Sequence, residues 1–118
     1  MGPRRAGPSV IAFPGRMPLQ IGFERIELNR ILDLYGRMVA AGQWRDYAMD
    51  FEKDAALFSA FRRSAERPEV RIEKRPALHA RQGMWTLFGE AGQVLKRGHE
   101  LPGVLAPIER RLLKIVED

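Results

Sequence analysis

Arginine and lysine are the residues of this sequence whose number and placement suggest a specific chemistry. Residues 55–81 carry seven of them against three acids, a net charge of +4, and a further basic pair stands at 96 and 97. Cationic side chains neutralise nucleic-acid phosphates and release their counterions, so a clustered set would bind DNA or RNA electrostatically. The predicted contact residues are Arg62, Arg63, Arg71, Lys74, Arg75, Arg81, Lys96 and Arg97.

Two phenylalanines would extend such a contact. Phe58 and Phe88 fall on predicted strands, where they could stack on bases, at about 1 to 3 kcal/mol per base, or pack against a protein partner. The basic residues also have an ordinary interpretation, because Glu66, Glu69 and Glu73 stand among them and can pair with them at under about 1 kcal/mol each. Nucleic-acid binding and a solvated charged surface therefore both remain open.

Residue types that carry catalysis or bind metals are sparse. The absence of cysteine excludes disulfides and thiolate chemistry and favours a reducing, cytoplasmic location. His79 and His99 lack metal-ligand spacing, and no serine lies in a nucleophile elbow. Asp46, Asp50 and Glu52 alternate along a predicted strand, which is typical of a solvated surface rather than of an acid–base pair. No metal, cofactor or catalytic residue is predicted, and an enzyme ranks last among the candidate functions.

The strongest helix signal lies between residues 25 and 41. Apolar residues recur there at the spacing of one buried helical stripe. Acidic residues near the start and Arg37 near the end suit the helix dipole, and Gly42 can end the helix in the left-handed conformation. The stripe consists of Leu28, Ile31, Leu32, Tyr35, Met38 and Val39.

After this helix the period of the apolar residues changes to two, which predicts strands. They are expected at residues 45–52, 57–63, 70–74, 84–88 and 94–97, with residues 19–23 as a candidate sixth strand. Short connections make neighbouring strands antiparallel, and the glycines at 89 and 92 mark a hairpin turn rather than a phosphate loop. The sheet is therefore predicted to be an antiparallel meander of five strands, or six.

A second amphipathic helix is predicted at the C-terminus, with Leu105, Ile108, Leu112 and Ile115 on its apolar stripe. Because Pro107 has no amide proton to donate, the regular helix is expected to begin there, with residues 100–106 as a preceding turn or a kinked extension. The order of helix, meander and helix predicts a two-layer α+β domain over residues 18–118. Residues 1–17, with three prolines, three glycines and three arginines, are predicted to be a disordered basic tail.

Two of the predicted strands are apolar on both sides. One face is expected to carry Leu57, Phe61, Trp85 and Leu87, and the other Phe58, Ala60, Met84 and Phe88. Each apolar face must be covered by a helix, a partner or a ligand. This favours an alternative function, a protein-interaction or regulatory module that forms a homodimer or binds a partner through an apolar sheet face. No apolar run reaches the roughly 18 residues of a membrane span, so no membrane association is predicted.

Three separate runs of the sequence resemble one known family. The runs LYGRMVAAGQWRDYAMDF at 34–51, RIEKRPAL at 71–78 and LKRGHEL at 95–101 are similar to a family of short alphaproteobacterial proteins, domain of unknown function 2794. The likeness covers roughly residues 20–115. It implies a small cytoplasmic bacterial protein and carries over no activity and no site residues.

Overall fold

The computed structural model describes residues 20–63 and 67–117. Within these residues, helix α1 is followed by five strands and then by helix α2, so the predicted α+β order of helix, meander and helix is confirmed. The elements are α1 (Arg25–Ala40), β1 (Asp46–Phe51), β2 (Ala56–Phe61), β3 (Val70–Lys74), a short 3₁₀ helix η1 (Pro76–Leu78), β4 (Trp85–Phe88), β5 (Val94–Gly98) and α2 (Leu101–Glu117). The tail predicted at 1–17 lies outside the described residues.

The strands form one antiparallel sheet in the order β1-β2-β3-β4-β5, each paired with the next along the chain. The pairs Phe58 with Ile72 and Ile72 with Leu87 fix the register at the centre of the sheet. The predicted sixth strand is absent from the described residues 20–23, although the amide of Ile21 donates a 2.9 Å hydrogen bond to the carbonyl of Glu52 at the β1 edge. Residue 19 of that prediction lies outside the described part of the chain.

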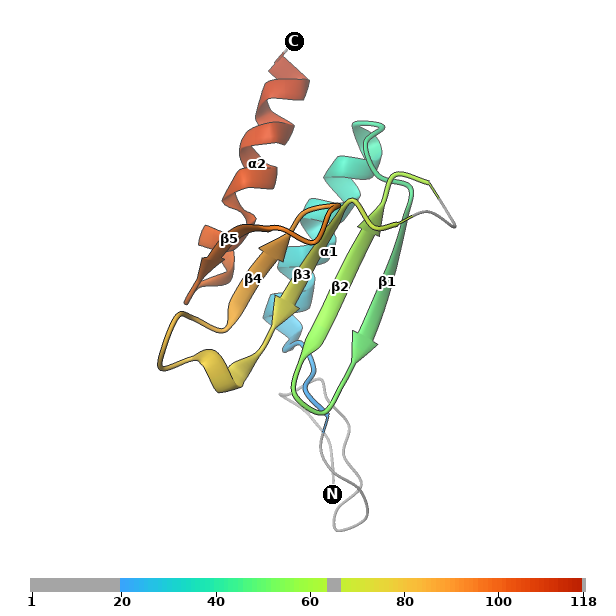
Figure 1. The fold of residues 1–118 in the computed structure, drawn as a ribbon. Coiled ribbons are helices and arrows are strands. Elements are labelled where there is room, and N and C mark those ends of the chain that lie inside the picture. The colour runs from blue at the N-terminus through green and yellow to red at the C-terminus, as the bar shows by residue number, and fades with distance from the viewer. Residues whose placement is uncertain (1–19, 64–66, 118) are drawn as a thin grey trace.

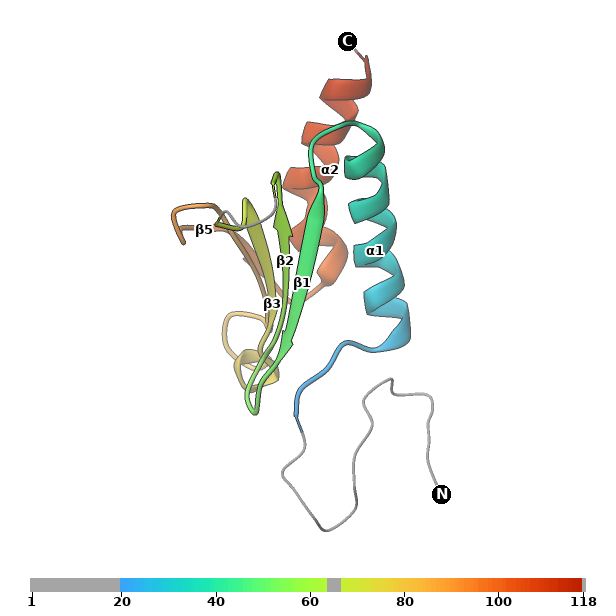
Figure 2. The same ribbon diagram turned by 90° about the vertical axis from the view of Figure 1, so that its right-hand side faces the viewer.

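Both helices pack on the same side of the sheet. Figure 1 looks onto the sheet with the helices behind it, and Figure 2 shows the sheet on one side and α1 and α2 together on the other. The covered side holds the core, because Phe58, Ile72 and Leu87 are each at most 1% exposed and pack with apolar residues of both helices. The predicted two-layer arrangement is thus observed, and the second face of the sheet has no helix over it.

The predicted division of side chains between the two faces was wrong. Alternation within each strand was correct, but the register places Trp85 and Leu87 on the same side as Phe58, and Phe88 with Leu57 on the other. Alternation fixes which residues of one strand share a face and says nothing about which face of the next strand joins them. Cross-strand pairing through β3 decides that question, and it was not available from the pattern.

Helix α1 follows the predicted stripe with two differences. Ile31 and Met38 are buried as expected, but Leu34 is also buried and Val39 is 40% exposed, because the stripe lies slightly to one side of the predicted one. Glu27 accepts a 2.8 Å hydrogen bond from the amide of Glu24 and so satisfies a donor at the helix start. Gly42 follows the helix at φ 77°, the left-handed conformation predicted for it.

Helix α2 begins six residues earlier than predicted, at Leu101, and Pro107 lies inside it. The hydrogen bond lost at Pro107 would have gone to the carbonyl of Gly103, and Gly103 is exposed, so water can take its place. The early start buries Leu101 and Val104, which join the core beside the predicted Leu105. Burial of these side chains outweighs the break that proline imposes, since each contributes about 1.5 to 3 kcal/mol.

Candidate functional site: the open face of the sheet

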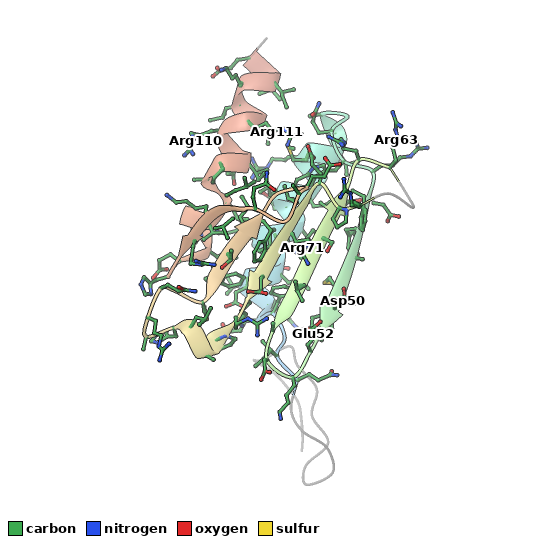
Figure 3. The ribbon with its side chains drawn as sticks, viewed as in Figure 1. Asp50, Glu52, Arg63, Arg71, Arg110 and Arg111 are labelled. Atoms are coloured by element: carbon green, nitrogen blue, oxygen red, sulfur yellow. The ribbon has the colours of Figure 1, made fainter. Side chains whose placement is uncertain are left out.

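We call the side of the sheet without helices the open face. It contains apolar, polar and charged residues, and in Figure 3 Arg71 lies over its middle while Asp50 and Glu52 lie along the β1 edge. Its apolar residues Leu57, Phe61 and Phe88 are half-buried, and no helix of the described chain lies over them. The open face consists of Asp46, Ala48, Asp50, Leu57, Ser59, Phe61, Arg71, Glu73, Thr86, Phe88, Val94 and Arg97.

Arg71 and Phe88 were both predicted as site residues, and the structure brings them into contact. They pair across β3 and β4, and the guanidinium carbon of Arg71 lies 5.1 Å from the centroid of the Phe88 ring. Such a cation–π contact contributes about 0.5 to 1 kcal/mol at an exposed site. It also holds the guanidinium over the Phe88 ring on the open face. Phe88 therefore positions the guanidinium of Arg71 on the open face.

Phe58 was predicted as a stacking residue, and this was wrong. Its side chain is 0% exposed and points to the covered face. Its ring stacks on Tyr47 with centroids 5.1 Å apart and meets Tyr35 edge-on at 6.0 Å. Phe58 therefore belongs to the core, and no ligand reaches it in the folded protein.

Lys74 was predicted as a nucleic-acid contact, and this too was wrong. It alternates with Arg71 along β3 and so points to the covered face, where it is 7% exposed. Its Nζ donates to a carboxylate oxygen of Glu27 at 2.7 Å and to the carbonyl of Gly22 at 2.9 Å, and it lies 5.9 Å from the Trp85 ring centroid. A buried ammonium needs such partners, and here they tie the start of α1 to the sheet.

The structure does not gather the other predicted cations into one patch. Arg62 and Arg63 follow the end of β2, whereas Arg75 and Arg81 follow the end of β3 at the opposite end of the sheet. Arg62 bridges to Glu90 at 2.9 Å, and Arg75 bridges to Glu73 at 3.2 Å. The hydrogen bond with Glu73 raises the pKa of Arg75 above its ordinary value. These two charges are therefore already neutralised within the protein.

The last two predicted cations lie on the edge strand β5. Arg97 is on the open face, where its Nε donates to the hydroxyl of Thr86 at 3.3 Å. Lys96 pairs with Leu87, so it alternates to the other side of this exposed strand. The open face thus has an acidic residue, Asp50, at one edge and a basic residue, Arg97, at the other.

Glu69 pairs with an arginine, as the sequence suggested, and it also has two partners that sequence reasoning missed. Its carboxylate accepts a 2.6 Å hydrogen bond from Nε1 of Trp44, forms a 2.9 Å ion pair with Arg111 and lies 3.6 Å from Arg62. It joins the end of α1, the start of β3 and the middle of α2. The contacts with Trp44 and Arg111 could not be seen in the sequence, because these two residues lie 25 and 42 residues away.

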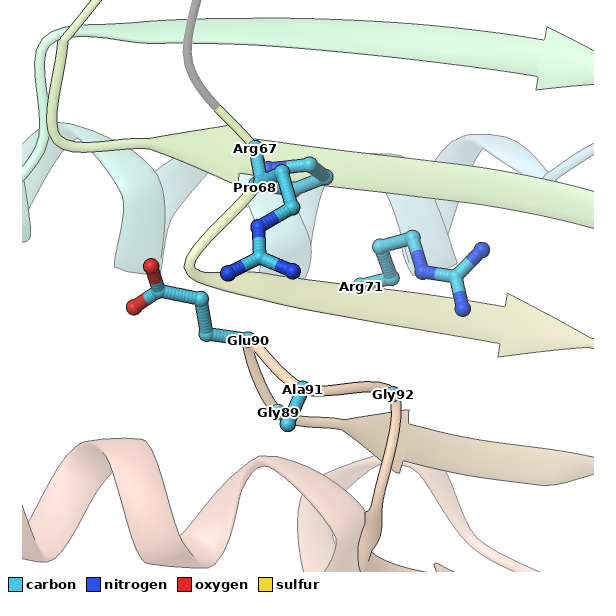
Figure 4. Close-up of a pocket in the computed structure, with 7 residues that line it drawn as sticks. All are labelled: Arg67, Pro68, Arg71, Gly89, Glu90, Ala91 and Gly92. Carbon is cyan, nitrogen blue, oxygen red and sulfur yellow. The ribbon is translucent and has the colours of Figure 1, made fainter.

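A shallow pocket opens at the end of the open face where β3 begins and β4 ends. Its volume is about 290 Å³, and it is lined by Arg67, Pro68, Arg71 and the turn 89–92 (Figure 4). Within that turn, the amides of Gly89 and Gly92 donate to backbone carbonyls at 2.8 and 3.0 Å, and the amide of Ala91 donates to the Gln93 side chain at 3.0 Å. The prediction of a hairpin turn is confirmed.

No candidate metal centre is found in the described part of the chain. No group of three or more histidine, aspartate or glutamate side chains there is placed to hold a metal ion. His79 and His99 are exposed and lie in separate loops. None of the helices of the described residues is long and apolar enough to span a membrane.

Fold and site define a class of protein, a small α+β domain with both helices on one face of an antiparallel sheet and a mixed apolar and charged surface on the other. Residues 21–105 match the model of the family described as Protein of unknown function (DUF2794), and the chain belongs to that family. The predicted resemblance is confirmed. No curated protein and no solved structure matches the chain.

Proposed function

We propose that this protein is an interaction domain that binds a polypeptide partner on the open face. The observation that supports it is the one-sided placement of the helices, which leaves Leu57, Phe61 and Phe88 without a helix over them in the described part of the chain. An antiparallel sheet that faces water on one side is ordinarily polar there. A partner that covers these side chains would remove their remaining apolar surface from water at about 25 cal/mol per Å².

Charge on the open face favours a polypeptide over a nucleic acid. Of the predicted cations, Lys74 is buried on the other side, and Arg62 and Arg75 are paired with carboxylates. Asp50 and Glu73 also lie on the open face, where they would repel a continuous chain of phosphates. A polypeptide can present apolar side chains to the apolar residues of the open face and charged side chains to the residues of opposite charge beside them.

The size of the open face sets the expected affinity. Five strands about 4.8 Å apart, with about five residues each at about 3.3 Å, give a face of about 400 Å². This is about half the roughly 800 Å² that each partner contributes to a stable interface of standard size. We therefore expect a transient complex with a dissociation constant in the micromolar range.

Selection from a displayed library of linear peptides on the full chain tests this proposal. We expect peptides whose affinity falls at least tenfold with Leu57→Glu, which replaces an apolar side chain of the open face with a charge. The matched control is Ile26→Glu on α1, an apolar side chain that is 75% exposed on the helical layer. If the selected peptides bind the Leu57→Glu variant with unchanged affinity, or if the library yields no binding peptide, the open face is not the binding surface.

Nucleic-acid binding is the second candidate, supported by the stacking of Arg71 on the half-buried Phe88. It predicts salt-dependent binding of single-stranded oligonucleotides that Phe88→Ala weakens by about 1 to 3 kcal/mol per stacked base. Fluorescence anisotropy with a labelled oligothymidylate at low salt measures it. Anisotropy that stays unchanged by the protein at low salt would remove this candidate.

A further inference from the structure

The pocket at the end of the open face carries two cations that no carboxylate of the described residues pairs with. Arg67 and Arg71 make no ion pair with any residue of the described chain. Glu90 also lines the pocket, but its carboxylate binds Arg62 at 2.9 Å. In Figure 4 the Arg67 side chain lies between Glu90 and Arg71. The pocket therefore has an excess of positive charge beside an apolar surface.

The donors that this pocket offers are side chains rather than backbone amides. Three amides of the turn, at Gly89, Ala91 and Gly92, donate to acceptors within the hairpin. A phosphate cradle needs several such amides to point at the ligand, so this turn does not provide one. Guanidinium groups present planar pairs of donors, which match the two oxygens of a carboxylate.

Arg71 is held ready for such a contact. Its guanidinium lies over the Phe88 ring, 5.1 Å from the centroid, so part of its side-chain freedom is already restricted before a ligand binds. A group restricted in this way loses less entropy on binding, which strengthens the net interaction. Phe88 also joins the pocket to the apolar centre of the open face.

We infer that this pocket takes the side-chain carboxylate of an aspartate or glutamate in a partner segment whose neighbouring apolar side chains cover Leu57 and Phe88. The inference rests on the proposed function and adds the anchoring chemistry of the partner. One or two carboxylates can enter at Arg67 and Arg71 while avoiding Asp46 and Asp50, which lie on the edge strand β1. A continuous polyanion that crosses the open face toward β1 would meet both carboxylates.

The probe is a short synthetic peptide of alternating glutamate and leucine, compared with a peptide in which glutamine replaces each glutamate. We expect the glutamate peptide to bind at least about tenfold more tightly, which corresponds to about 1.4 kcal/mol. Its binding should shift the NMR signals of the amides at 89–92. The double variant Arg67→Ala with Arg71→Ala should abolish the difference between the two peptides.

The control Arg30→Ala with Arg110→Ala removes the same charge from exposed positions on the two helices and should preserve the difference. If both peptides bind equally and Leu57→Glu weakens both, the carboxylate pocket is wrong and the proposed function stands. If neither peptide binds and the displayed library also fails, both are wrong. If inorganic phosphate or oligothymidylate shifts the 89–92 amides and the glutamate peptide does not, the pocket binds a phosphate group and the inference is overturned.

Discussion

Leu57 and Phe58 are neighbours in β2, and their surroundings are opposite. Phe58 is 0% exposed between the aromatic rings of Tyr35 and Tyr47, whereas Leu57 is half-buried on the open face with no helix above it. The covered face has apolar side chains packed by two helices, and the open face has similar side chains that only the neighbouring strands shield. The covered face therefore stabilises the fold, whereas the open face keeps apolar surface that a partner can cover.

The largest effect should follow from truncating the covered side of β2. We expect Phe58→Ala to lower the free energy of unfolding by about 3 to 5 kcal/mol, because it leaves a cavity in the packed core. Leu57→Ala should lower it by about 1 kcal/mol, because that side chain is already partly in water. Urea denaturation of both variants measures the contrast. Equal losses would contradict the assignment of the two faces.

Lys74 gives the next contrast, between a buried and an exposed cation at the end of β3. Lys74→Ala removes the ammonium that neutralises Glu27 and should lower the free energy of unfolding by about 3 to 5 kcal/mol. Lys74→Met, which keeps the length and lacks the charge, tests whether packing or the ion pair matters more. Arg75→Ala breaks a half-exposed bridge to Glu73 and should lose less than about 1 kcal/mol. Thermal unfolding ranks the three variants, and an equal effect of Lys74→Ala and Arg75→Ala would contradict the burial of Lys74.

Glu69 tests how the helical layer is held onto the sheet. Glu69→Ala leaves Trp44 Nε1 without its 2.6 Å acceptor and removes the partner of Arg111, so we expect a loss of about 1 to 3 kcal/mol. Arg37→Ala, which breaks an exposed bridge between α1 and Glu109 of α2, should lose under about 1 kcal/mol. Denaturation monitored by Trp fluorescence compares them. If the Glu69 variant is as stable as the Arg37 variant, the contacts of Glu69 with Trp44 and Arg111 contribute no more than an exposed ion pair.

The smallest effect concerns pH. Burial, followed by the charges of Asp46 and Tyr47, raises the pKa of Tyr35 above its ordinary value of 10.0. The unfolded chain therefore loses this proton first as the pH rises, and stability falls from about pH 10 upward while remaining unaffected below it. Tyr35→Phe should lack this part of the alkaline loss. Denaturation at pH 9 and pH 11, together with NMR titration of the tyrosine ring carbons, checks the direction.

Local patterns predicted the elements of this fold because they depend on nearby residues. The stripe of α1, the left-handed Gly42 and the hairpin at 89–92 each follow from spacing or from the type of one residue. The alternation within β2 was also correct. These features need no knowledge of which strand lies beside which.

Features that depend on distant pairing could not be obtained in this way. Lys74 reaches Glu27 across 47 residues, and whether it pointed to the core depended on the register of β3. The same register decided that Phe58 was buried and Phe88 was not. Pro107 indicated a helix boundary from local chemistry alone, whereas tertiary burial of Leu101 and Val104 extended α2 past it.

Methyl NMR of the full chain with a peptide selected by display is the most direct test of the open face as the binding surface. The Leu57 methyl groups report on the open face, and the methyl group of Ile26 reports on the helical layer. We predict that the peptide shifts the Leu57 signals in a saturable manner and leaves those of Ile26 in place. Shifts at Ile26 with Leu57 unchanged would contradict the account.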